Sequence, residues 1–468
     1  MILGERMGRV RRIHCVGIGG TGMNGIAELL FNLGYEVSGS DCRSSGVTER
    51  LAALGVRITL GHHAEAIRGA DVIVVSSAIG SGNAELTAAR ELKIPIIPRA
   101  EMLAELMRFR YGIAVAGSHG KTTTTALIAS LLVEAGEDPT FVIGGRLNSV
   151  SANARLGSGR YLVAEADESD ASFLLYQPLL AVVTNVDRDH LNAYQGDFDR
   201  LRQAFSDFLH HLPFYGFAVV GIDDPEVARL APAISRPTLR YGFSETADVR
   251  GVRLVSEGLR TRIQVARNGR PETEFTVNLA GRHNAQNALA AIAVADVLEL
   301  SDEALARALD HFQGTGRRFQ LHGTAHRGTT GFLLVEDYAH HPREIEATLE
   351  AAEQAWPDRR KVVVFQPHRY SRTFDLMEDF SRVLSQVAVL VLTEVYPAGE
   401  RPIPGADGRA LSRAVRLRGP AVPVFADRLS DLPGLLGRLV EPDDVVLLLG
   451  AGDWGELIPE LMAGGTRS

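Results

Sequence analysis

Residues Val115–Ser130 read VAGSHGKTTTTALIAS, and this stretch indicates how the middle of the chain folds. It continues the apolar run that begins YGIA, so a buried strand enters a turn that contains Gly117 and Gly120. The residues after the turn form a helix, whose first N–H groups face the loop. A strand, a glycine-rich turn and a helix in this order are typical of a site that holds a phosphate.

The loop carries most of the groups that nucleotide-binding loops use. Gly120, Lys121 and Thr122 fit the end of the pattern G-x-x-x-x-G-K-[ST], but Val115 stands where the first glycine is expected. Gly117 offers the shorter turn G-x-x-G-K-T instead. Backbone amides can surround a phosphate, the Lys121 ammonium can neutralise its β and γ oxygens, and the Thr122 hydroxyl can reach Mg²⁺. We expect a bound nucleotide, and the alternative is a surface turn without a ligand.

Short apolar runs alternate with helical patterns along the whole chain, which predicts an α/β protein with doubly wound, mostly parallel sheets. The 468 residues suggest about three domains at roughly 150 residues each. We place these domains at residues 1–108, 109–321 and 322–468. We expect a Rossmann-like N-terminal domain, a central P-loop ATPase domain with a mostly parallel sheet, and a Rossmann-like C-terminal domain. A stretch rich in Thr, Val and Arg, residues 249–279, predicts a β-rich insertion.

The composition argues against several classes of protein. With 49 Lys and Arg against 57 Asp and Glu the formal net charge is −8, and no basic run is interleaved with aromatic residues, so nucleic acid is not an expected partner. The two cysteines, Cys15 and Cys42, show neither metal-ligand spacing nor a disulfide framework. No apolar run approaches the length of a membrane span. We expect a cytoplasmic protein without a membrane partner.

A second glycine turn, GIGGTG, follows the first predicted strand. Gly17, Gly19 and Gly22 match the pattern G-x-G-x-x-G, and Asp41 ends the next strand at about the spacing of a ribose-binding acid. Such a turn lets backbone N–H groups approach a diphosphate at the start of a helix. A dinucleotide, another diphosphate and a purely structural turn are all compatible with this pattern.

Acidic residues follow two of the predicted buried strands in the middle of the chain. The stretch LVAEADESD supplies Glu165 and three further acids, and VTNVDRDH supplies two aspartates and His190. Strand ends of a parallel sheet meet at one edge, where ligands bind. Mg²⁺ prefers oxygen ligands, so these residues are candidates for a metal site beside the phosphate. The alternative is a solvated acidic loop.

Taken together, the motifs GIGGTGM, GSHGKTTTT, EADESDASF, TNVDRDHL, GRHNAQNALAA, GTGRRFQ, EDYAHHP and PHRYSRT resemble those of the Mur ligases. The resemblance extends over nearly the whole chain, in the same order. It implies a UDP-substrate domain, an ATPase domain and an amino-acid-binding domain. It also implies an ATP- and Mg²⁺-dependent ligase that joins L-alanine to the lactyl carboxylate of UDP-N-acetylmuramate through an acyl phosphate, in peptidoglycan precursor synthesis. The resemblance does not indicate an oligomeric state.

The resemblance assigns two nucleotide-binding sets by motif. The expected UDP-sugar contacts are Gly17, Gly19, Gly20, Thr21, Gly22, Asp41, Ser76 and Ser77. The expected ATP contacts are Gly117, Ser118, His119, Gly120, Lys121, Thr122, Thr123, His283, Asn287, Arg318 and Asp337. Asn287 stands four residues after His283, a spacing that places the two side chains on one face of a helix.

The resemblance further implies an amino-acid site and a metal site. The expected amino-acid contacts are Tyr338, His340, Arg369 and Arg372, since arginine forks bind carboxylates. The expected metal ligands are Thr122, Glu165 and His190. The expected catalytic residues are Lys121, His190, His340 and Arg318, with Arg317 as the alternative to Arg318 and with the general base left between the two histidines.

Two rival functions stay open at this point. A recycling ligase that attaches a whole tripeptide to the same UDP-sugar shares the first two domains, although we do not expect HRYSRT in its amino-acid region. An NAD-binding oxidoreductase with a nucleotide-regulated module would use GIGGTG for a dinucleotide. Arg369 and Arg372 could also have no ligand, because arginines three residues apart occur on the solvated face of a helix.

Overall fold

The computed structural model describes residues 7–20, 22–76, 78–149, 152–327, 330–452, 454–455 and 457–463. Two expected UDP-sugar contacts, Thr21 and Ser77, lie outside these residues. The chain separates into two compact units, each described below by itself. The first unit comprises Met1–Arg253, Ile263–Val277 and Gln286–Gln313, and the second comprises Leu254–Arg262, Asn278–Ala285 and Gly314–Ser468. None of the helices in the described ranges has the length and apolar character needed to cross a membrane.

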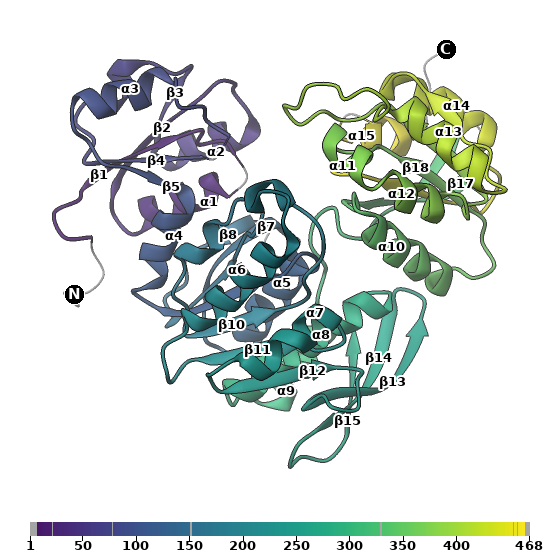
Figure 1. Ribbon diagram of the computed structural model, residues 1–468, viewed down its shortest axis with the longest axis horizontal. Helices are drawn as coiled ribbons and strands as arrows, with labels where there is room; N and C mark the ends of the chain where they lie inside the picture. The colour runs from purple at the N-terminus through teal and green to yellow at the C-terminus, as the bar shows by residue number, and fades with distance from the viewer. Residues whose placement is uncertain are drawn as a thin grey trace. The chain divides into compact units, whose positions relative to one another are not determined.

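The first unit begins with a five-stranded parallel sheet in the order β3-β2-β1-β4-β5, drawn in purple and blue (Figure 1). Its strands are β1 (Arg12–Val16), β2 (Glu36–Asp41), β3 (Arg57–Leu60), β4 (Val72–Val75) and β5 (Ile96–Pro98). The connecting helices are α1 (Met23–Asn32), α2 (Gly46–Leu54), the 3₁₀ turn η1 (Ala64–Ile67), α3 (Ala84–Glu91) and α4 (Arg99–Met107). The doubly wound order, with β1 at the centre, confirms the predicted Rossmann-like fold.

A ten-stranded sheet follows, in the order β15-β14-β13-β12-β11-β10-β6-β9-β7-β8. Its strands are β6 (Tyr111–Ala116), β7 (Thr140–Leu147), β8 (Ala152–Arg155), β9 (Tyr161–Glu165), β10 (Leu180–Val183), β11 (Phe217–Gly221), β12 (Thr238–Gly242), β13 (Val249–Glu257), β14 (Arg260–Arg267) and β15 (Thr273–Val277). The run β12-β11-β10-β6-β9-β7 is parallel, and the edge strand β8 pairs antiparallel with β7. The last three strands are the β-rich insertion that the composition of 249–279 predicts.

The helices around this sheet are α5 (Lys121–Glu134), η2 (Ser172–Leu175), η3 (Leu191–Tyr194), α6 (Phe198–His210), α7 (Pro225–Leu230), η4 (Ala231–Ala233), α8 (Arg282–Val297) and α9 (Asp302–Asp310). Helix α5, which follows the phosphate loop, is buried on almost every side from Thr122 to Leu132. Its sequence TTTTALIASLL has no charged residue, as expected for a helix enclosed by its neighbours. The N-terminus of α5 is therefore fixed in place by packing.

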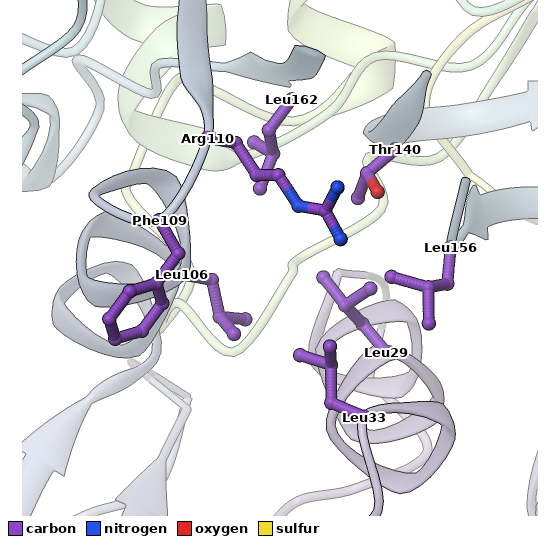
Figure 2. Close-up of a pocket in the computed structure, with 8 residues that line it drawn as sticks. All are labelled: Leu29, Leu33, Leu106, Phe109, Arg110, Thr140, Leu156 and Leu162. Atoms are coloured by element: carbon purple, nitrogen blue, oxygen red, sulfur yellow. The ribbon is translucent and has the colours of Figure 1, made fainter. Parts of the chain in front are cut away.

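Within the first unit, α1 packs against β8 and α4, and residues of α1, α4, β7 and β9 line a small gap (Figure 2). A Cβ on Gly25 would lie 2.6 Å from the Cβ of Ala154, so the helix approaches β8 closely because residue 25 has no side chain. Asn153 donates a hydrogen bond to the Asn24 side chain at 2.8 Å. The small gap beside this contact holds about 20 Å³ and is lined by leucines from both layers. It has room for a water molecule and is a packing defect rather than a ligand site.

The second unit contains a six-stranded sheet in the order β16-β17-β21-β18-β19-β20. Its strands are β16 (Gln320–Arg327), β17 (Thr330–Asp337), β18 (Lys361–Phe365), β19 (Val389–Thr393), β20 (Val424–Ala426) and β21 (Val445–Leu449). Its helices are α10 (Pro342–Ala355), α11 (Tyr370–Asp375), α12 (Met377–Leu384), α13 (Gly408–Arg418), η5 (Leu429–Asp431), α14 (Leu432–Leu439) and α15 (Leu457–Met462). All five residues of β21, VVLLL, are buried, as expected for a parallel strand covered on both faces.

The three sheets match the predicted fold class, an α/β chain with mostly parallel strands. The domain limits at 108 and 321 stay a prediction. The stretch IPIIPRAEML forms the short strand β5, and α4 begins at Arg99 directly after Pro98. Proline is compatible with a helix start because its missing N–H would have no partner within the helix.

Candidate active site

The phosphate loop begins later than the common pattern because β6 extends to Ala116. Val115 is a buried strand residue that pairs with Glu165 of β9, so no turn exists at the position of the missing glycine. The turn starts at Gly117, whose φ of 134° and contact with the Thr184 hydroxyl leave no room for a side chain. Gly120 has a φ of 83°, and a Cβ there would lie 2.5 Å from Oδ1 of Asn287. Both glycines of the shorter turn are therefore required by geometry.

The residues after β10 hold the loop by its backbone. The backbone N–H of His119 donates to Oδ1 of Asn185 at 2.8 Å, and the Asn185 amide donates back to the His119 carbonyl at 2.9 Å. The Thr184 hydroxyl donates to the same carbonyl at 2.7 Å. Sequence reasoning missed both residues, although they lie in the stretch VTNVDRDH. The sequence carried no signal for this contact, because it depends on β10 lying next to β6 in the folded sheet.

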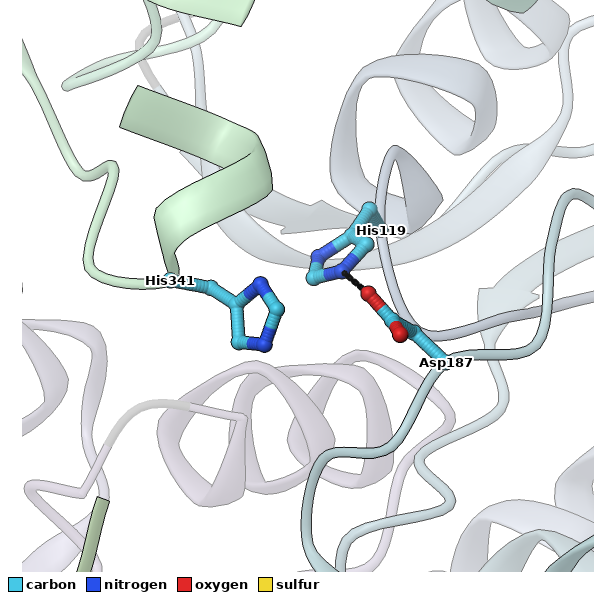
Figure 3. A group of neighbouring side chains, drawn as sticks. All are labelled: His119, Asp187 and His341. Atoms are coloured by element: carbon cyan, nitrogen blue, oxygen red, sulfur yellow. Dashed lines mark hydrogen bonds and ion pairs between the residues drawn. The ribbon is translucent and has the colours of Figure 1, made fainter. Parts of the chain in front are cut away.

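His119 is held by an acidic side chain. Its Nε2 lies 3.1 Å from Oδ2 of the buried Asp187, as Figure 3 shows. The backbone N–H of Asp187 in turn donates to the Ser118 hydroxyl at 2.8 Å. The ring of His119 therefore contributes to the shape of the turn through Asp187.

Lys121 points back across its own loop. Its ammonium donates to the Gly117 carbonyl at 2.6 Å and to both carboxylate oxygens of Glu168, at 2.7 and 3.0 Å. Burial opposes the charged ammonium, but the carboxylates of Glu168, Asp167 and Glu165 outweigh it and raise the pKa of Lys121. The ammonium is thus kept charged beside the loop that would receive a phosphate. Glu168 is one of the three acids that follow Glu165 in LVAEADESD, and its ion pair with Lys121 was not expected from the sequence.

Two of the expected metal ligands lie together. The Thr122 hydroxyl donates to Oε2 of Glu165 at 3.2 Å, and the Gly144 N–H donates to Oε1 at 2.6 Å. Burial raises the pKa of Asp167, but the Lys121 charge and hydrogen bonds from Ser169 outweigh it and lower that pKa overall. A hydroxyl and ionised carboxylates at one strand end are the oxygen donors that Mg²⁺ prefers, so the residues fit such an ion.

The third expected metal ligand, His190, adopts a left-handed backbone conformation with a φ of 56°. Its backbone N–H donates to Oδ1 of Asp189 at 2.9 Å, and its Nε2 lies 3.4 Å from Oδ2 of the same residue. The charge of His190 also contributes to the lowered pKa of Asp167, which places it at the same acidic strand end. Nearby, the Tyr194 hydroxyl donates to the Glu168 carbonyl at 2.6 Å and fixes the position of that segment.

The first glycine turn is closed by Asp41. Oδ2 of Asp41 accepts the Gly19 N–H at 2.9 Å, and Gly17 and Gly22 have φ values of 79° and 85°. A Cβ on Gly17 would lie 3.4 Å from Cβ of Ser76, so the ends of β1 and β4 border the same turn. A Cβ on Gly22 would lie 3.0 Å from Nη1 of Arg99, a residue that sequence reasoning missed. An arginine beside this turn adds a positive charge where a diphosphate is expected.

The two ATP contacts expected in the motif GRHNAQNALAA, His283 and Asn287, fall in different units. Asn287, on α8 in the first unit, is buried beside the phosphate loop, where its Oδ1 accepts the Thr124 hydroxyl at 3.2 Å. His283, four residues earlier, belongs to the second unit. Burial lowers the pKa of His283 to about 4, so this imidazole is neutral at physiological pH.

The structure separates the two arginines of GTGRRFQ. Nε of Arg317 donates to Oε1 of Glu336 at 2.8 Å, and its Nη2 donates to the Gly450 carbonyl at 3.2 Å. Arg318 lies with its guanidinium carbon 5.0 Å from the centre of the Tyr338 ring, and it forms no ion pair with a described residue of its unit. Arg317 therefore connects the segment GTGRRFQ to the sheet of the second unit. The N–H donors of Arg318 are available to a ligand.

Asp337 also fixes the backbone of the segment GTGRRFQ, at Phe319. Its two oxygens accept the N–H groups of Phe319 and Ala339, both at 2.7 Å. Burial raises the pKa of Asp337 to about 6, against the opposing charge of Arg318. The expected ATP contact is thus also the group that fixes the start of the second unit.

The expected amino-acid site is a cluster of aromatic rings. Nδ1 of His340 lies 2.9 Å from the Tyr338 carbonyl, and the ring of His340 meets the ring of His368 edge-on at 5.8 Å. His368 in turn stacks on Tyr396, with ring centres 5.5 Å apart and an angle of 7° between planes. The motif PHRYSRT contains His368, which is not among the expected contacts. No motif contains Tyr396, which lies in a distant loop.

Arg369 and Arg372 lie beside this cluster. Arg369 has a φ of 71° at the start of α11, and its buried Nε has no hydrogen-bond partner among the described residues. Arg372 is only 7% exposed, with Nη1 3.4 Å from the His368 carbonyl. The alternative of a solvated helix face is therefore wrong for Arg372. The burial of Arg372 and the unsatisfied Nε donor of Arg369 together suit a carboxylate ligand.

Comparison with known proteins gives three consecutive family matches. The model described as "Mur ligase family, catalytic domain" matches residues 12–111, and "Mur ligase middle domain" matches residues 115–295. The model described as "Mur ligase, glutamate ligase domain" matches residues 317–452. The three matches together cover most of the chain.

Individual relatives match over nearly the full length. The chain is 60% identical over 458 residues to the UDP-N-acetylmuramate–L-alanine ligase of Halorhodospira halophila, which covers 98% of this chain and 94% of that protein. The crystal structure of the UDP-N-acetylmuramate–alanine ligase of Thermotoga maritima is 29% identical, with a TM-score of 0.80 over 97% of this chain and 98% of that one. A murein peptide ligase of Psychrobacter arcticus is 25% identical, with a TM-score of 0.71 over 98% of this chain and 100% of that one.

Proposed function

The chain belongs to the Mur ligase family, and on this premise we propose that it joins L-alanine to the lactyl carboxylate of UDP-N-acetylmuramate at the expense of ATP. The single observation that carries this choice is the 60% identity, over nearly the full length, to the UDP-N-acetylmuramate–L-alanine ligase of Halorhodospira halophila. Peptidoglycan precursor synthesis is the corresponding process. Because both UDP-N-acetylmuramate and ATP are nucleotides, we expect the reaction in the cytoplasm.

The first unit would bind both nucleotides. The glycine turn after β1, with Asp41 and Arg99 beside it, would hold the diphosphate of the UDP-sugar. The loop at 117–123 would surround the ATP phosphates, with Lys121 on the β and γ side. Thr122 and Glu165 would hold one Mg²⁺, which would supply positive charge for the phosphate, and His190 would serve a second ion.

The second unit would receive the amino acid. Arg369 and Arg372 would bind the carboxylate of L-alanine, since Arg372 is buried beside the His368 carbonyl and the buried Nε of Arg369 has no hydrogen-bond partner among the described residues. The rings of Tyr338, His340 and His368 would lie beside the bound amino acid. Arg318 would approach the γ-phosphate.

The reaction has two bond-forming steps. A lactyl carboxylate oxygen attacks the γ-phosphorus of ATP, and the bond to the β-γ bridging oxygen breaks to release ADP. The amine of L-alanine then attacks the acyl carbon, and the carbon–oxygen bond to phosphate breaks to release inorganic phosphate and the amide. Lys121 and Arg318 would stabilise the charge that develops in the first step.

The amine must lose a proton before or during its attack. Nδ1 of His340 lies 2.9 Å from the Tyr338 carbonyl and 3.3 Å from Oε2 of Glu344, so a proton on that nitrogen makes Nε2 the basic one. We favour His340 over His190 as the general base, since His190 would serve the metal in this proposal.

Phosphate release from ATP tests the proposal. With UDP-N-acetylmuramate and Mg²⁺ present, L-alanine should support turnover, and the murein tripeptide should not. Lys121→Ala should abolish turnover, and EDTA should do the same reversibly. Preference for the tripeptide would instead support the recycling ligase, and tight NAD binding without ATP turnover would support the oxidoreductase.

A further inference from the structure

A pocket of about 290 Å³ lies in the Rossmann-like part of the first unit, away from the nucleotide sites. It is lined by the first residues of three strands, Arg12 of β1, Glu36 of β2 and Arg57 of β3. The glycine turn and Asp41 lie at the opposite, carboxyl ends of these strands. The length of β2 from Glu36 to Asp41 separates the two edges by roughly 17 Å at about 3.3 Å per residue. The pocket is therefore a second site and not an extension of the UDP-sugar site.

The lining of this pocket is positively charged. Arg12, Arg57 and Arg68 face it with Glu36 as the only acidic lining residue, which gives a local net charge of +3 − 1 = +2. Arg12 has a counter-ion, because its Nη2 lies 3.7 Å from Asp71. For Arg57 and Arg68, by contrast, the described residues provide neither an ion pair nor a hydrogen bond to the guanidinium. Two uncompensated arginines on one concavity are unexpected in a chain whose formal net charge is −8.

The local backbone keeps the pocket open. Gly69, with a φ of 78°, lies against Arg12, and a Cβ at this position would be 2.9 Å from its Nη1. Any larger residue would displace the arginine from the rim. The inner wall is apolar and aromatic: Tyr35 is buried, and Phe31 is half-buried beside it. The Tyr35 hydroxyl accepts the Met7 N–H at 2.9 Å, so the wall is fixed.

We propose that this pocket binds a small molecule that carries a phosphate or pyrophosphate group, at a site distinct from both substrate nucleotide sites. The planar guanidinium groups of Arg57 and Arg68, each with paired N–H donors, match the negative charge and the paired oxygen acceptors of a phosphate. The aromatic wall of Phe31 and Tyr35 accepts an apolar or ring-shaped part of the same ligand. The volume is at the lower end of the range for small-molecule sites, so the ligand is of metabolite size.

Calorimetric titration of the full chain with inorganic pyrophosphate tests the site. ADP and UDP-N-acetylmuramate are held at saturation, so that the phosphate loop and the glycine turn are occupied, and no turnover occurs without ATP. Magnesium is left out to keep pyrophosphate free, and ionic strength is kept constant. We expect saturable binding with a stoichiometry of about one. The double variant Arg57→Ser/Arg68→Ser should weaken binding at least tenfold.

The matched control is the double variant Lys93→Ser/Arg253→Ser, which removes two exposed positive charges elsewhere in the first unit. Its affinity for pyrophosphate should stay within twofold of the parent. Both double variants should keep the melting temperature and the alanine-dependent turnover, because neither touches the catalytic residues. Equal weakening in both variants would show bulk electrostatics and overturn the proposal, and so would the absence of saturable binding in the parent chain.

Discussion

The ammonium of Lys121 lies 2.7 Å from Oε2 of Glu168, a carboxylate that is only 1% exposed. The pair places a buried positive charge where ATP phosphates are expected, and the phosphates must compete with Glu168 for it. A buried ion pair costs desolvation, and loss of one partner is strongly destabilising. The nucleotide would repair such a loss by supplying a new anion.

Glu168→Gln should therefore lower the melting temperature of the nucleotide-free protein. Its free energy of unfolding should fall by on the order of 3–5 kcal/mol if the ammonium stays charged. The rise in melting temperature on addition of ADP should be larger in the variant than in the parent. Differential scanning fluorimetry with and without ADP measures both effects. Asp170→Asn, at an exposed acid of the same segment, is the control. An unchanged ADP-induced shift in Glu168→Gln would contradict the proposed competition.

Asn185→Ala removes both hydrogen bonds between this side chain and the backbone of His119. At about 1 kcal/mol for each bond, the looser loop should raise KM for ATP by about 10–30-fold. The KM for L-alanine should not change, because the amino-acid site lies in the second unit. Steady-state kinetics with Asn192→Ala as the exposed control checks this. A change confined to kcat would argue against a role in shaping the nucleotide site.

The two adjacent arginines should separate stability from catalysis. Arg317→Met leaves Glu336 buried without its arginine, so the melting temperature should fall by several degrees. Arg318→Met should leave the melting temperature nearly unchanged and lower kcat about 100-fold or more, as loss of a charge-stabilising group does. Thermal melting and single-turnover phosphate release distinguish the two. If the two variants showed the opposite pattern, Arg317 would be the arginine at the γ-phosphate.

Arg369→Gln and Arg372→Gln should each raise KM for L-alanine about 100-fold, since a charge-assisted hydrogen bond to a carboxylate contributes roughly 2–3 kcal/mol. KM for ATP and for UDP-N-acetylmuramate should stay within twofold. Arg413→Gln, on α13 of the same unit, serves as the control. Parallel rises in all three KM values would indicate a general structural loss in place of an alanine contact.

Glu85 predicts a pH dependence in the Rossmann-like sheet. It is fully buried, accepts the Ser40 hydroxyl at 2.6 Å and lies 3.4 Å from His14 and 3.1 Å from His62. Burial raises the pKa of Glu85, but the contacts with His14, Ser40 and His62 outweigh it and lower that pKa overall. Because the pKa of Glu85 is lower in the folded state, its ionised carboxylate stabilises the protein at pH values above its unfolded-state pKa of about 4.3. This stabilisation is lost as the pH falls through the pKa of the folded state.

Glu85→Gln should therefore be less stable than the parent at pH 7, and the difference should shrink as the pH falls below about 4.3. Urea denaturation at pH 7 and at pH 4 measures the difference. Glu91→Gln, at the exposed end of α3, should show no such pH dependence. A difference that grows on acidification would mean that Glu85 is protonated in the folded state.

The fold class and the nucleotide loop could be predicted from the sequence because their signals are local. The apolar runs, the glycine turns and the residues Gly117–Thr122 each depend on neighbours in the chain. The partners Asn185, Arg99 and Tyr396 could not be predicted, because each meets its site only after strands or loops far apart in sequence come together. The domain limits and the chemical roles of the site residues stay predictions until the variants above are measured.

The functional groups can be identified along the chain: a phosphate loop with a lysine, acids at strand ends, and paired arginines. Their use depends on contacts that form when the chain folds. Val115 stands in place of a glycine because β6 continues to Ala116, and His119 turns toward Asp187 because β10 lies beside β6. Arg317 and Arg318 differ in their partners: Arg317 pairs with the buried carboxylate of Glu336, whereas Arg318 lies over the ring of Tyr338. Charge balance in a low-dielectric interior depends on contacts across the fold, which no local pattern of residues encodes.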